Sequence, residues 1–529
     1  MEKLLLLGAE AIAQGALDAG MSGIYAYPGT PSTEITEYVQ RNLYAREKNI
    51  HSAWSANEKT AMEASLGMSY CGKRSMVCMK HVGLNVAADV FVNSAITGTG
   101  GGLIVAVADD PSMHSSQNEQ DSRFYAKFAL IPVLEPSSQQ EAYEMAYQGF
   151  QLSEEFHLPV MIRITTRLSH SRAGVKRLAH IGENELKLPE DPRQFILLPA
   201  IARKRYKMLL KAQPDLERSA LISPFNEFHD GYDHSLGIVV SGIAMNYLNE
   251  NYPGGIPFPV LKIGQYPLPM ELVLKITISC NSVLVLEEGA PMIEESLRGF
   301  LNNGPIPIHG RLDGTLPRDG ELNPDIVRGA LGLESHPGPN VPELVIERPP
   351  ALCKGCGHID TFKVLLEALE NYGEGRTFSD IGCYTLGALP PFNAINSCVD
   401  MGASVTMAKG AADAGLVPAV AVIGDSTFTH SGMTGLLDAV NENSPITVVI
   451  SDNEVTGMTG GQKSSAEGKI ESICKGIGVS EEHIRIITPL KKNHLANVIM
   501  MQEELAFKGV SVVISRRECI QTASKKKRN

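Results

Sequence analysis

The sequence predicts an α/β protein made of several doubly wound, mostly parallel sheets, and three observations lead to this prediction. Short runs of Val, Ile and Leu without alternating polar residues recur along the chain, a pattern typical of strands buried on both faces. Ala-rich stretches with helical character separate these runs, as the crossover connections of parallel strands require. The chain has 529 residues, which is too many for one hydrophobic core.

The predicted elements alternate along the chain. Each expected strand is a short apolar run such as SMVCMK or PAVAVIGDS. The expected strands are 75–80, 101–110, 158–166, 235–242, 282–289, 418–426, 445–453 and 509–517. The expected helices are 55–70, 139–155, 241–251, 402–415 and 431–443. This alternation predicts strand–helix–strand units and parallel sheets.

Two segments interrupt the pattern and divide the chain. Residues 172–234 lack buried-strand character and contain the basic amphipathic stretch ARKRYKMLLK, so we expect a connector with one helix. Residues 334–350 contain five prolines, which predicts an extended linker. Three α/β units remain, at 1–171, 235–333 and 351–529.

Composition excludes some classes of function. The chain has 47 Lys and Arg against 59 Asp and Glu, so its net charge of −12 argues against nucleic acid or an anionic membrane as a partner. The basic run from Lys525 to Arg528 is expected to be a solvated tail. No apolar run is long enough for a signal peptide or a membrane span, so we expect a cytoplasmic protein. The nine cysteines should then be reduced thiols or metal ligands.

Oxygen-bearing side chains follow two successive predicted strands. Asp425 lies at the end of the run PAVAVIGDS and Asn453 at the end of PITVVISDN. Ligands bind at the carboxyl ends of strands in open α/β sheets, and Mg²⁺ prefers oxygen ligands that it shares with phosphate groups. The alternative is that Asp425 only caps the following helix. The second partner, Asn453, favours the metal site.

The segments after these two residues fit a diphosphate. The chain turns after Gly424, Asp425 and Ser426 into a helix, whose amino end offers unpaired N–H groups. The segment EVTGMTGG, which includes Val455, Gly457, Met458 and Thr459, offers the carbonyl of Val455 and a turn that can approach a ligand closely. The pattern predicts that Asp425, Asn453 and the Val455 carbonyl bind one Mg²⁺.

The GDS-to-Asn arrangement resembles the thiamin-diphosphate motif of 2-oxoacid:ferredoxin oxidoreductases. The longer strings AYPGTPSTEI, WSANEKTAMEASLGMSYCGKRSMVCMKHVGLNVAAD, ADDPSMHSSQNEQDSRFYAKFALIPVLEPSS and GDSTFTHSGMTGLLDAV resemble the large subunits of indolepyruvate:ferredoxin oxidoreductases. The resemblance spans nearly the whole chain and implies a thiamin-diphosphate-binding fold. It implies a pyrimidine-binding domain at 1–171, a transketolase-C-like domain at 235–333 and a diphosphate-binding domain at 351–529.

The resemblance also implies roles for single residues. Glu58 matches the acid that activates the aminopyrimidine ring of the cofactor. From the pattern alone, Ser55 and Glu58 fit a helix capping box equally well. Thr30 matches a threonine that faces the oxoacid, while Arg123 and His114 lie in a segment similar to one near the substrate, where Arg suits a carboxylate. Either of the last two can instead be a surface or helix-end residue. Secondary candidates for the site are Lys80, His81 and His430.

One departure from the family pattern concerns the substrate. Pyruvate-specific relatives carry Asn where this chain has Met458. A flexible thioether suits a bulky 2-oxoacid, so the residue favours an arylpyruvate.

Four cysteines form the second candidate site. Cys353 and Cys356 form a CxxC pair, which alone is compatible with zinc, a redox pair or no function. Cys383 and Cys519 follow predicted strands. The order of the four resembles the ligand pattern of a [4Fe–4S] cluster in related catalytic subunits. Related large subunits end in a ferredoxin-like domain with two CxxCxxCxxxCP runs, and this sequence contains no such run. Electrons should then leave through a partner subunit or a soluble ferredoxin.

Together these features predict oxidative decarboxylation of a 2-oxoacid, such as indolepyruvate, to an acyl-CoA. The resemblance implies a smaller β subunit and an assembly of the α₂β₂ type. One alternative is a non-oxidative thiamin-diphosphate 2-oxoacid decarboxylase, which needs no iron. Another is a scaffold without catalytic activity, which would bind no cofactor.

Overall fold

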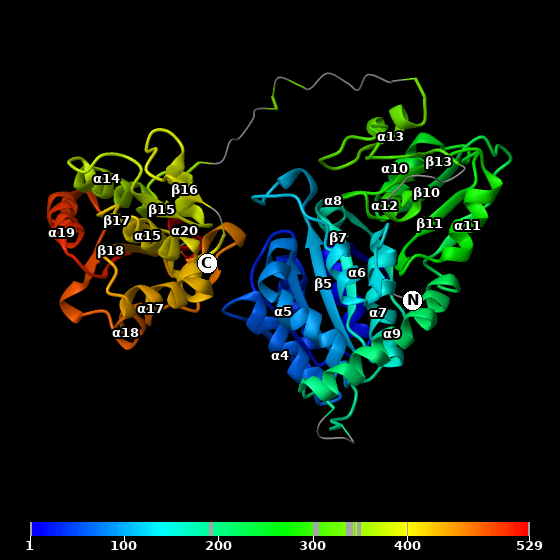
Figure 1. The fold of residues 1–529 in the computed structure, drawn as a ribbon, viewed down its shortest axis with the longest axis horizontal. Coiled ribbons are helices and arrows are strands. Elements are labelled where there is room, and N and C mark those ends of the chain that lie inside the picture. Colours follow the sequence, from blue (N-terminus) through cyan, green and yellow to red (C-terminus); the bar gives the residue numbers. More distant parts are fainter. Residues whose placement is uncertain are drawn as a thin grey trace. The chain divides into compact units, whose positions relative to one another are not determined.

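The chain forms two compact units, Met1–Pro339 and Asn340–Asn529, which are described separately below (Figure 1). The computed structural model describes residues 3–189, 194–299, 306–334, 342, 344–345, 351–398 and 400–526. Most of the predicted linker at 334–350 and the last residues of the basic tail lie outside this description. No helix among the described residues is long and apolar enough to cross a membrane.

A seven-stranded sheet forms the first half of unit Met1–Pro339. Its strand order is β12-β6-β7-β5-β4-β2-β3, and all neighbouring pairs are parallel except β12 with β6. The strands are β2 (Gly23–Ala26), β3 (His51–Trp54), β4 (Ser75–Lys80), β5 (Leu103–Asp109), β6 (Val133–Leu134), β7 (Val160–Thr165) and β12 (Gln265–Tyr266). The strands expected at 75–80, 101–110 and 158–166 are confirmed as β4, β5 and β7.

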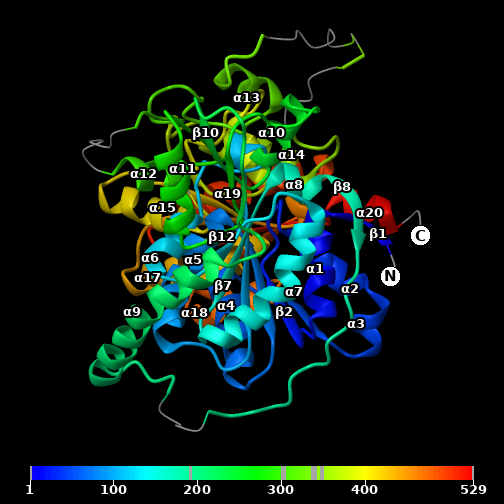
Figure 2. The same cartoon turned by 90° about the vertical axis from the view of Figure 1, so that its right-hand side faces the viewer.

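Both faces of this sheet are covered, as the uninterrupted apolar runs predicted. Met76 and Cys78 of β4 pack into a core with helices α1 (Gly8–Asp18) and α7 (Gln139–Phe156). Val77 and Met79 point to the other face, against α4 (Glu58–Tyr70) and α5 (His81–Thr97). Successive side chains of a strand alternate between faces, so one strand supplies both cores. Figure 2 shows α1 and α7 side by side.

A second sheet completes the unit. Its order is β14-β13-β10-β11-β9, with β9 antiparallel and the others parallel. The strands are β9 (Glu227–His229), β10 (Gly237–Ser241), β11 (Val260–Ile263), β13 (Val283–Leu286) and β14 (Ile308–His309). Its helices include α10 (Ala244–Asn251), α11 (Met270–Ser279), α12 (Met292–Arg298) and α13 (Pro324–Ala330). Because β12 follows β11 and pairs with β6, this chain segment joins the two sheets.

The segment 172–234 contains the expected helix, α9 (Pro199–Leu221), and two short strands that the sequence did not indicate. One is β8 (Arg172–Lys176), which pairs antiparallel with β1 (Lys3–Leu7). The other is β9. Short helices complete the unit: α2 (Thr33–Arg41), α3 (Leu43–Glu47), α6 (Arg123–Ala129) and α8 (Thr166–His170).

Unit Asn340–Asn529 is built on a six-stranded, fully parallel sheet of order β16-β15-β17-β18-β22-β21. The strands are β15 (Thr377–Ser379), β16 (Ser397–Cys398), β17 (Ala419–Gly424), β18 (Ile446–Asp452), β21 (Ile484–Ile487) and β22 (Ser511–Arg516). Core residues of α15 (Ala403–Asp413), α17 (Met433–Asn441) and α18 (Ile470–Ile477) cover one face, and those of α14 (Gly357–Leu369) and α19 (His494–Ala506) cover the other. The predicted doubly wound α/β class is therefore confirmed.

A buried ionic cluster lies in unit Met1–Pro339. Arg163, on β7, has no exposed side-chain surface. Its guanidinium donates to Asp109 Oδ2 at 2.8 Å, Glu135 Oε1 at 2.5 Å and the carbonyl oxygen of Glu288 at 2.8 Å. Burial raises the pKa of Asp109, and the Arg163 charge opposes that rise. The positive charge of Arg163 therefore offsets part of the free-energy cost of burying these ionised carboxylates.

We expect Arg163→Met to lower the free energy of unfolding of this unit by about 3–5 kcal/mol, because it leaves buried carboxylates without a counter-charge. Urea unfolding followed by the fluorescence of Trp54, the chain's one tryptophan, reports on this unit. The matched control is Arg167→Met, whose side chain is 45% exposed and pairs with Glu321; it should cost less than about 1 kcal/mol. Equal effects of the two substitutions would contradict the role of the cluster.

Candidate functional site

The predicted metal ligands Asp425 and Asn453 follow two neighbouring strands of one sheet. β17 and β18 pair in parallel with Gly424 opposite Ser451. Asp425 comes directly after β17, and Asn453 directly after β18. The hydroxyl of Thr456 donates to Ser426 Oγ at 3.0 Å, so the loops that follow the two strands contact each other. The structure thus brings these two segments together at the carboxyl edge of the sheet.

Asp425 has an unusual environment for a carboxylate. Its exposed fraction is 2%, and its Oδ2 atom has no hydrogen-bond partner within the described residues. Burial raises its pKa to about 7, although the nearby Ser464 side chain opposes the rise. A buried carboxylate oxygen without a partner is costly, and a divalent cation would compensate for it. The donor chemistry at this position fits a magnesium ion.

The capping alternative for Asp425 is wrong. The following helical segment is continuous, with α16 (Asp425–Thr427), a π-helical turn (Phe428–Gly432) and α17. Gly424, not Asp425, occupies the position before the first helical residue, and no side-chain cap hydrogen bond forms there. His430 is buried in the π-helical turn, with Nδ1 2.5 Å from Ser431 Oγ. Asp425 is therefore the first residue of the helix and not its N-cap, and its carboxylate interacts with the backbone N–H of Ser426.

The segment after Asn453 forms a tight hairpin. Asn453 Oδ1 accepts a hydrogen bond from the N–H of Val455 at 3.1 Å. β19 (Val455–Thr456) then pairs with β20 (Gln462–Lys463) across a 3₁₀ turn, Gly457–Thr459. Gly460 and Gly461 have φ angles of 121° and 90°, which favour glycine. The predicted glycine-rich turn thus positions the Val455 backbone beside Asn453. Met458 lies on the turn with 57% of its surface exposed.

The four predicted cluster cysteines are gathered from three parts of the same unit. Cys353 and Cys356 precede α14, Cys383 starts a 3₁₀ turn after β15, and Cys519 precedes α20 (Ile520–Lys526). The pKa of the Cys383 thiol is raised to about 12, first by burial and then by the nearby thiols of Cys356, Cys519 and Cys353. All four sulfur atoms therefore lie close enough to interact.

This cysteine group adjoins Asn453 and the β19–β20 hairpin. The N–H of Cys519 donates to the carbonyl oxygen of Asn453 at 3.3 Å. A Cβ atom placed on Gly457 would lie 3.2 Å from Cys383 Sγ. Among the described residues, no three His, Cys, Asp or Glu side chains form a group that could hold a metal ion. A [4Fe–4S] cube binds each thiolate at a separate iron atom, so its ligands lie farther apart than those of one ion.

Glu58 is buried at the amino end of α4, with an exposed fraction of 5%. Its side chain reaches α5, since a Cβ on Gly83 would lie 2.6 Å from Glu58 Oε1. The capping-box alternative for Ser55 and Glu58 is wrong: Asn57 caps the helix and forms the capping box with Thr60. Glu58 follows β3, so it lies at the carboxyl edge of its sheet, the edge where ligands bind in open α/β sheets.

Thr30 lies on the turn after β2, at the same edge. Its peptide bond to Pro31 is cis, and its carbonyl oxygen accepts a hydrogen bond from Ser115 Oγ at 3.2 Å. The Ser115 carbonyl in turn accepts from Lys80 Nζ at 3.0 Å, at the end of β4. His81 starts α5, and its Nε2 lies 3.2 Å from the carbonyl oxygen of Asn118. The ends of β2, β3 and β4 thus each supply a candidate residue.

Arg123 and His114 make contacts that the sequence did not indicate. The Arg123 side chain is fully buried, and its guanidinium contacts Asp121, Tyr266 and Glu287. His114 is about half exposed, with Nε2 3.3 Å from Glu321 Oε2. In this structure both side chains contact other protein groups.

Two polar residues near the Asp425 site were missed by the sequence reasoning. Ser464 lies close enough to Asp425 to lower the pKa of its carboxyl group. Asp380, directly after β15, is buried with its pKa raised to about 7 by burial, and it accepts hydrogen bonds from Ser404 Oγ at 2.5 Å and from Tyr384. The pattern that identified Asp425, an acid after a buried strand, also identifies Asp380.

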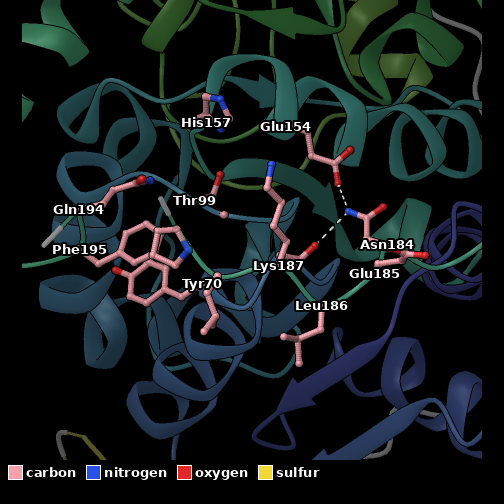
Figure 3. Close-up of a pocket in the computed structure, with 14 residues that line it drawn as sticks. Tyr70, Thr99, Glu154, His157, Asn184, Glu185, Leu186, Lys187, Gln194 and Phe195 are labelled. Carbon is pink, nitrogen blue, oxygen red and sulfur yellow. Dashed lines mark hydrogen bonds between the residues drawn. The ribbon is translucent and has the colours of Figure 1, made fainter. Parts of the chain in front are cut away.

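A separate cavity of about 630 Å³ lies in unit Met1–Pro339 (Figure 3). Tyr70 stacks on Phe195 there, with ring centroids 3.7 Å apart, and Asn184 donates to Glu154 at 2.7 Å. Its lining residues Gly72 and Thr99 precede β4 and β5, so the cavity adjoins the amino ends of strands whose carboxyl ends carry Lys80 and Asp110. It is not part of the candidate site.

Comparisons with known proteins find a family match in each of the two units. Residues 14–206 match the family "Pyruvate flavodoxin/ferredoxin oxidoreductase, thiamine diP-bdg". Residues 380–502 match the family "Thiamine pyrophosphate enzyme, C-terminal TPP binding domain". The first match contains Thr30, Glu58 and Lys80, and the second contains Asp425 and Asn453. These matches support binding of thiamin diphosphate.

Curated relatives align along nearly the whole chain. The indolepyruvate oxidoreductase subunit IorA of Methanothermobacter thermautotrophicus is 38% identical over 548 residues, which cover 98% of this chain and 87% of the relative. The IorA subunit of Archaeoglobus fulgidus is 39% identical over 550 residues, covering 98% and 86%. The solved 2-oxoglutarate:ferredoxin oxidoreductase from Magnetococcus marinus aligns with this chain with a TM-score of 0.51 and 16% identity. The alignment covers 62% of this chain and 65% of that chain, and it supports the α/β fold described above. With relatives this similar over almost its full length, the chain belongs to the family of IorA subunits of indolepyruvate oxidoreductases.

Proposed function

We propose that the chain is the thiamin-diphosphate-binding subunit of an enzyme that oxidatively decarboxylates an aryl 2-oxoacid, indolepyruvate, to the corresponding acyl-CoA. Within the IorA family assignment, the observation that carries the proposal is the buried Oδ2 of Asp425, which has no hydrogen-bond partner among the described residues and lies at the end of β17, the strand paired with β18. The half-exposed Met458 on the adjacent hairpin favours a bulky substrate.

Asp425, Asn453 and the carbonyl of Val455 would hold a Mg²⁺ ion that binds the cofactor's diphosphate. Asn453 Oδ1 already accepts one hydrogen bond, and an amide oxygen has a second lone pair for a cation. Gly424, Ser426, Gly457 and Thr459 would line the diphosphate, together with the N–H groups at the start of α16. When bound, thiamin diphosphate supplies the nucleophile and the electron sink for decarboxylation.

Glu58 and Thr30 would act on the pyrimidine ring and the oxoacid. In the proposed site, a Glu58 carboxyl oxygen exchanges a proton with the aminopyrimidine ring, and the burial of Glu58 keeps water away from that proton. The Thr30 hydroxyl faces the substrate. Arg123 has no direct part in the proposed chemistry, because its guanidinium contacts protein carboxylates and Tyr266. The half-exposed His114 likewise has no assigned step.

The four cysteines Cys353, Cys356, Cys383 and Cys519 would bind a [4Fe–4S] cluster next to the cofactor. Such a cluster accepts electrons one at a time, which suits transfer to ferredoxin or to a partner subunit. The proposed assembly contains a smaller β subunit in an α₂β₂-type complex in the cytoplasm, where thiols stay reduced. Native mass spectrometry of the anaerobically purified complex tests it, since a lone chain with full activity would contradict the assembly.

The function is tested by measuring CO₂ release and viologen reduction against a panel of 2-oxoacids, with and without CoA. We expect the highest kcat/KM with aryl 2-oxoacids, and viologen reduction in step with CO₂ release. CO₂ release without an electron acceptor, from protein that contains no iron, would instead support a non-oxidative decarboxylase. Protein that binds no thiamin diphosphate would support a scaffold.

We expect Cys383→Ser to remove most of the iron and acid-labile sulfide from anaerobically purified protein, because it deletes one of the four proposed ligands. Thiamin-diphosphate affinity should change little, since Asp425 and Asn453 are intact. Cys71→Ser, in the other unit, is the control and should keep the wild-type iron content. Unchanged iron and sulfide in Cys383→Ser would contradict the assignment of this cysteine.

A further inference from the structure

Lys80 is a buried lysine whose charge the proposed chemistry does not yet use. It is the last residue of β4, and 9% of it is exposed. Its aliphatic stem contacts Gly29, where an added Cβ would lie 3.4 Å from Lys80 Cδ. Its ammonium makes one hydrogen bond with the described residues, to the Ser115 carbonyl at 3.0 Å. An ammonium carries three protons, so two of them have no acceptor among the described residues.

The groups around Lys80 belong to the candidate site. Ser115 contacts both Lys80 and Thr30, because its carbonyl accepts from Lys80 and its hydroxyl donates to the Thr30 carbonyl at 3.2 Å. The charges of Asp110 and Glu58 both act on the Lys80 ammonium. Lys80 thus lies beside the turn that faces the oxoacid and near the acid that faces the pyrimidine ring. These two carboxylates supply counter-charge, but no hydrogen bond joins either of them to the ammonium among the described residues, so a bound anion could still accept its two remaining protons.

We propose that Lys80 binds the carboxylate of the 2-oxoacid substrate and so sets the position of its keto carbon. This inference rests on the proposed function. A substrate carboxylate offers acceptors for the two remaining ammonium protons. Arg123, the cation that sequence reasoning favoured for this task, has its guanidinium against Asp121 and Glu287. The Lys80 ammonium, in contrast, has two N–H donors without an acceptor among the described residues.

The test compares two unreactive ligands on the complex loaded with thiamin diphosphate and Mg²⁺. Indole-3-propionate carries the carboxylate, and indole-3-propionamide has the same shape without the charge. By isothermal titration calorimetry, Lys80→Met should weaken binding of the acid about 10- to 100-fold and leave the amide nearly unchanged. KM for the 2-oxoacid should rise by a similar factor. Lys59→Met, on an exposed part of α4, is the matched control and should change neither affinity.

The pH dependence of binding provides a second readout. Burial lowers the pKa of Lys80 to about 8, against the opposing charges of Asp110 and Glu58. Asp110 itself stays charged, because hydrogen bonds from Ser116, Thr166 and Ser115 outweigh its burial and lower its pKa. On the other elements that contact Lys80, Gly29, Thr30 and Ser115 have no titratable side chain, and the adjacent His81 contacts the Asn118 carbonyl.

Because the lysine is protonated below its pKa, affinity for the acid should fall as the pH rises through about 8. In Lys80→Arg the cation stays protonated, so this decrease should disappear while part of the affinity is kept. The amide should show no such pH dependence in either protein.

The outcomes separate this inference from the proposed function. If Lys80→Met weakens the acid and the amide equally, or weakens neither, Lys80 does not bind the carboxylate. If the loss occurs in thiamin-diphosphate affinity instead, Lys80 acts through Glu58 or the cofactor, and the inference is also wrong. Wild-type protein that releases no CO₂ from any 2-oxoacid would overturn the proposed function itself.

Discussion

Asp425→Ala is expected to weaken thiamin-diphosphate binding by more than about 100-fold and to abolish CO₂ release at ordinary cofactor concentrations. Changing a residue that only supports a metal ligand typically costs 10- to 100-fold, and Asp425 is proposed as a ligand itself. Cofactor affinity is measured by calorimetry at fixed Mg²⁺ concentration. Asp438→Ala, on the exposed face of α17, is the control and should bind the cofactor normally. Normal cofactor binding in Asp425→Ala would contradict the proposed ligand role.

The same site predicts an opposite effect on the stability of the cofactor-free protein. Burial raises the pKa of Asp425 from 3.8 to about 7, so its carboxylate destabilises the folded state above pH 7, and this penalty disappears as the pH falls toward 4. Asp425→Asn removes the charge. It should therefore stabilise the cofactor-free protein by roughly 2–4 kcal/mol at pH 7 and above, and much less near pH 4. Urea unfolding at the two pH values measures this difference.

Glu58→Gln is expected to lower kcat about 10²- to 10⁴-fold, the usual range for the loss of a positioned proton donor. Glutamine keeps the shape of the side chain beside Gly83, so cofactor affinity should change far less than kcat. Glu63→Gln, on the same helix with 45% of the Glu63 side chain exposed, is the matched control. The measurements are steady-state CO₂ release and cofactor titration.

A Glu58→Gln protein with wild-type kcat would remove Glu58 from the chemistry. A protein that loses kcat only because it no longer binds cofactor would instead indicate a binding role for this residue.

The positions of Asp425 and Asn453 could be predicted from sequence because their strands are fully buried. In such strands the apolar run ends where the strand ends, and β17 and β18 stop within two residues of the expected positions. Neighbouring parallel strands then place both residues at one edge without any knowledge of the tertiary contacts. The short edge strands β3 and β8 lack this signal, since most of their residues are at least partly exposed, and they were not predicted.

The contacts of Arg123 and the residue that caps the amino end of α4 could not be predicted in this way. Arg123 contacts Tyr266 and Glu287, which are distant in sequence, so its local segment carries no sign of burial. Both Ser55 and Asn57 can cap a helix, and the spacing to Glu58 favoured Ser55. In the structure the cap is Asn57, and the Glu58 side chain packs against α5. The surroundings of Arg123 are thus set by long-range packing, whereas the cap of α4 is a local choice that the capping box of Asn57 with Thr60 decides.

The proposed chemistry requires that Asp425 and Asn453 jointly hold the divalent ion that binds thiamin diphosphate. The most direct test is an experimental structure of the complex with cofactor and Mg²⁺ bound. A cation should then lie about 2.0–2.1 Å from one oxygen of each side chain and from a diphosphate oxygen. A cofactor bound elsewhere, or a cation that contacts neither side chain, would contradict it.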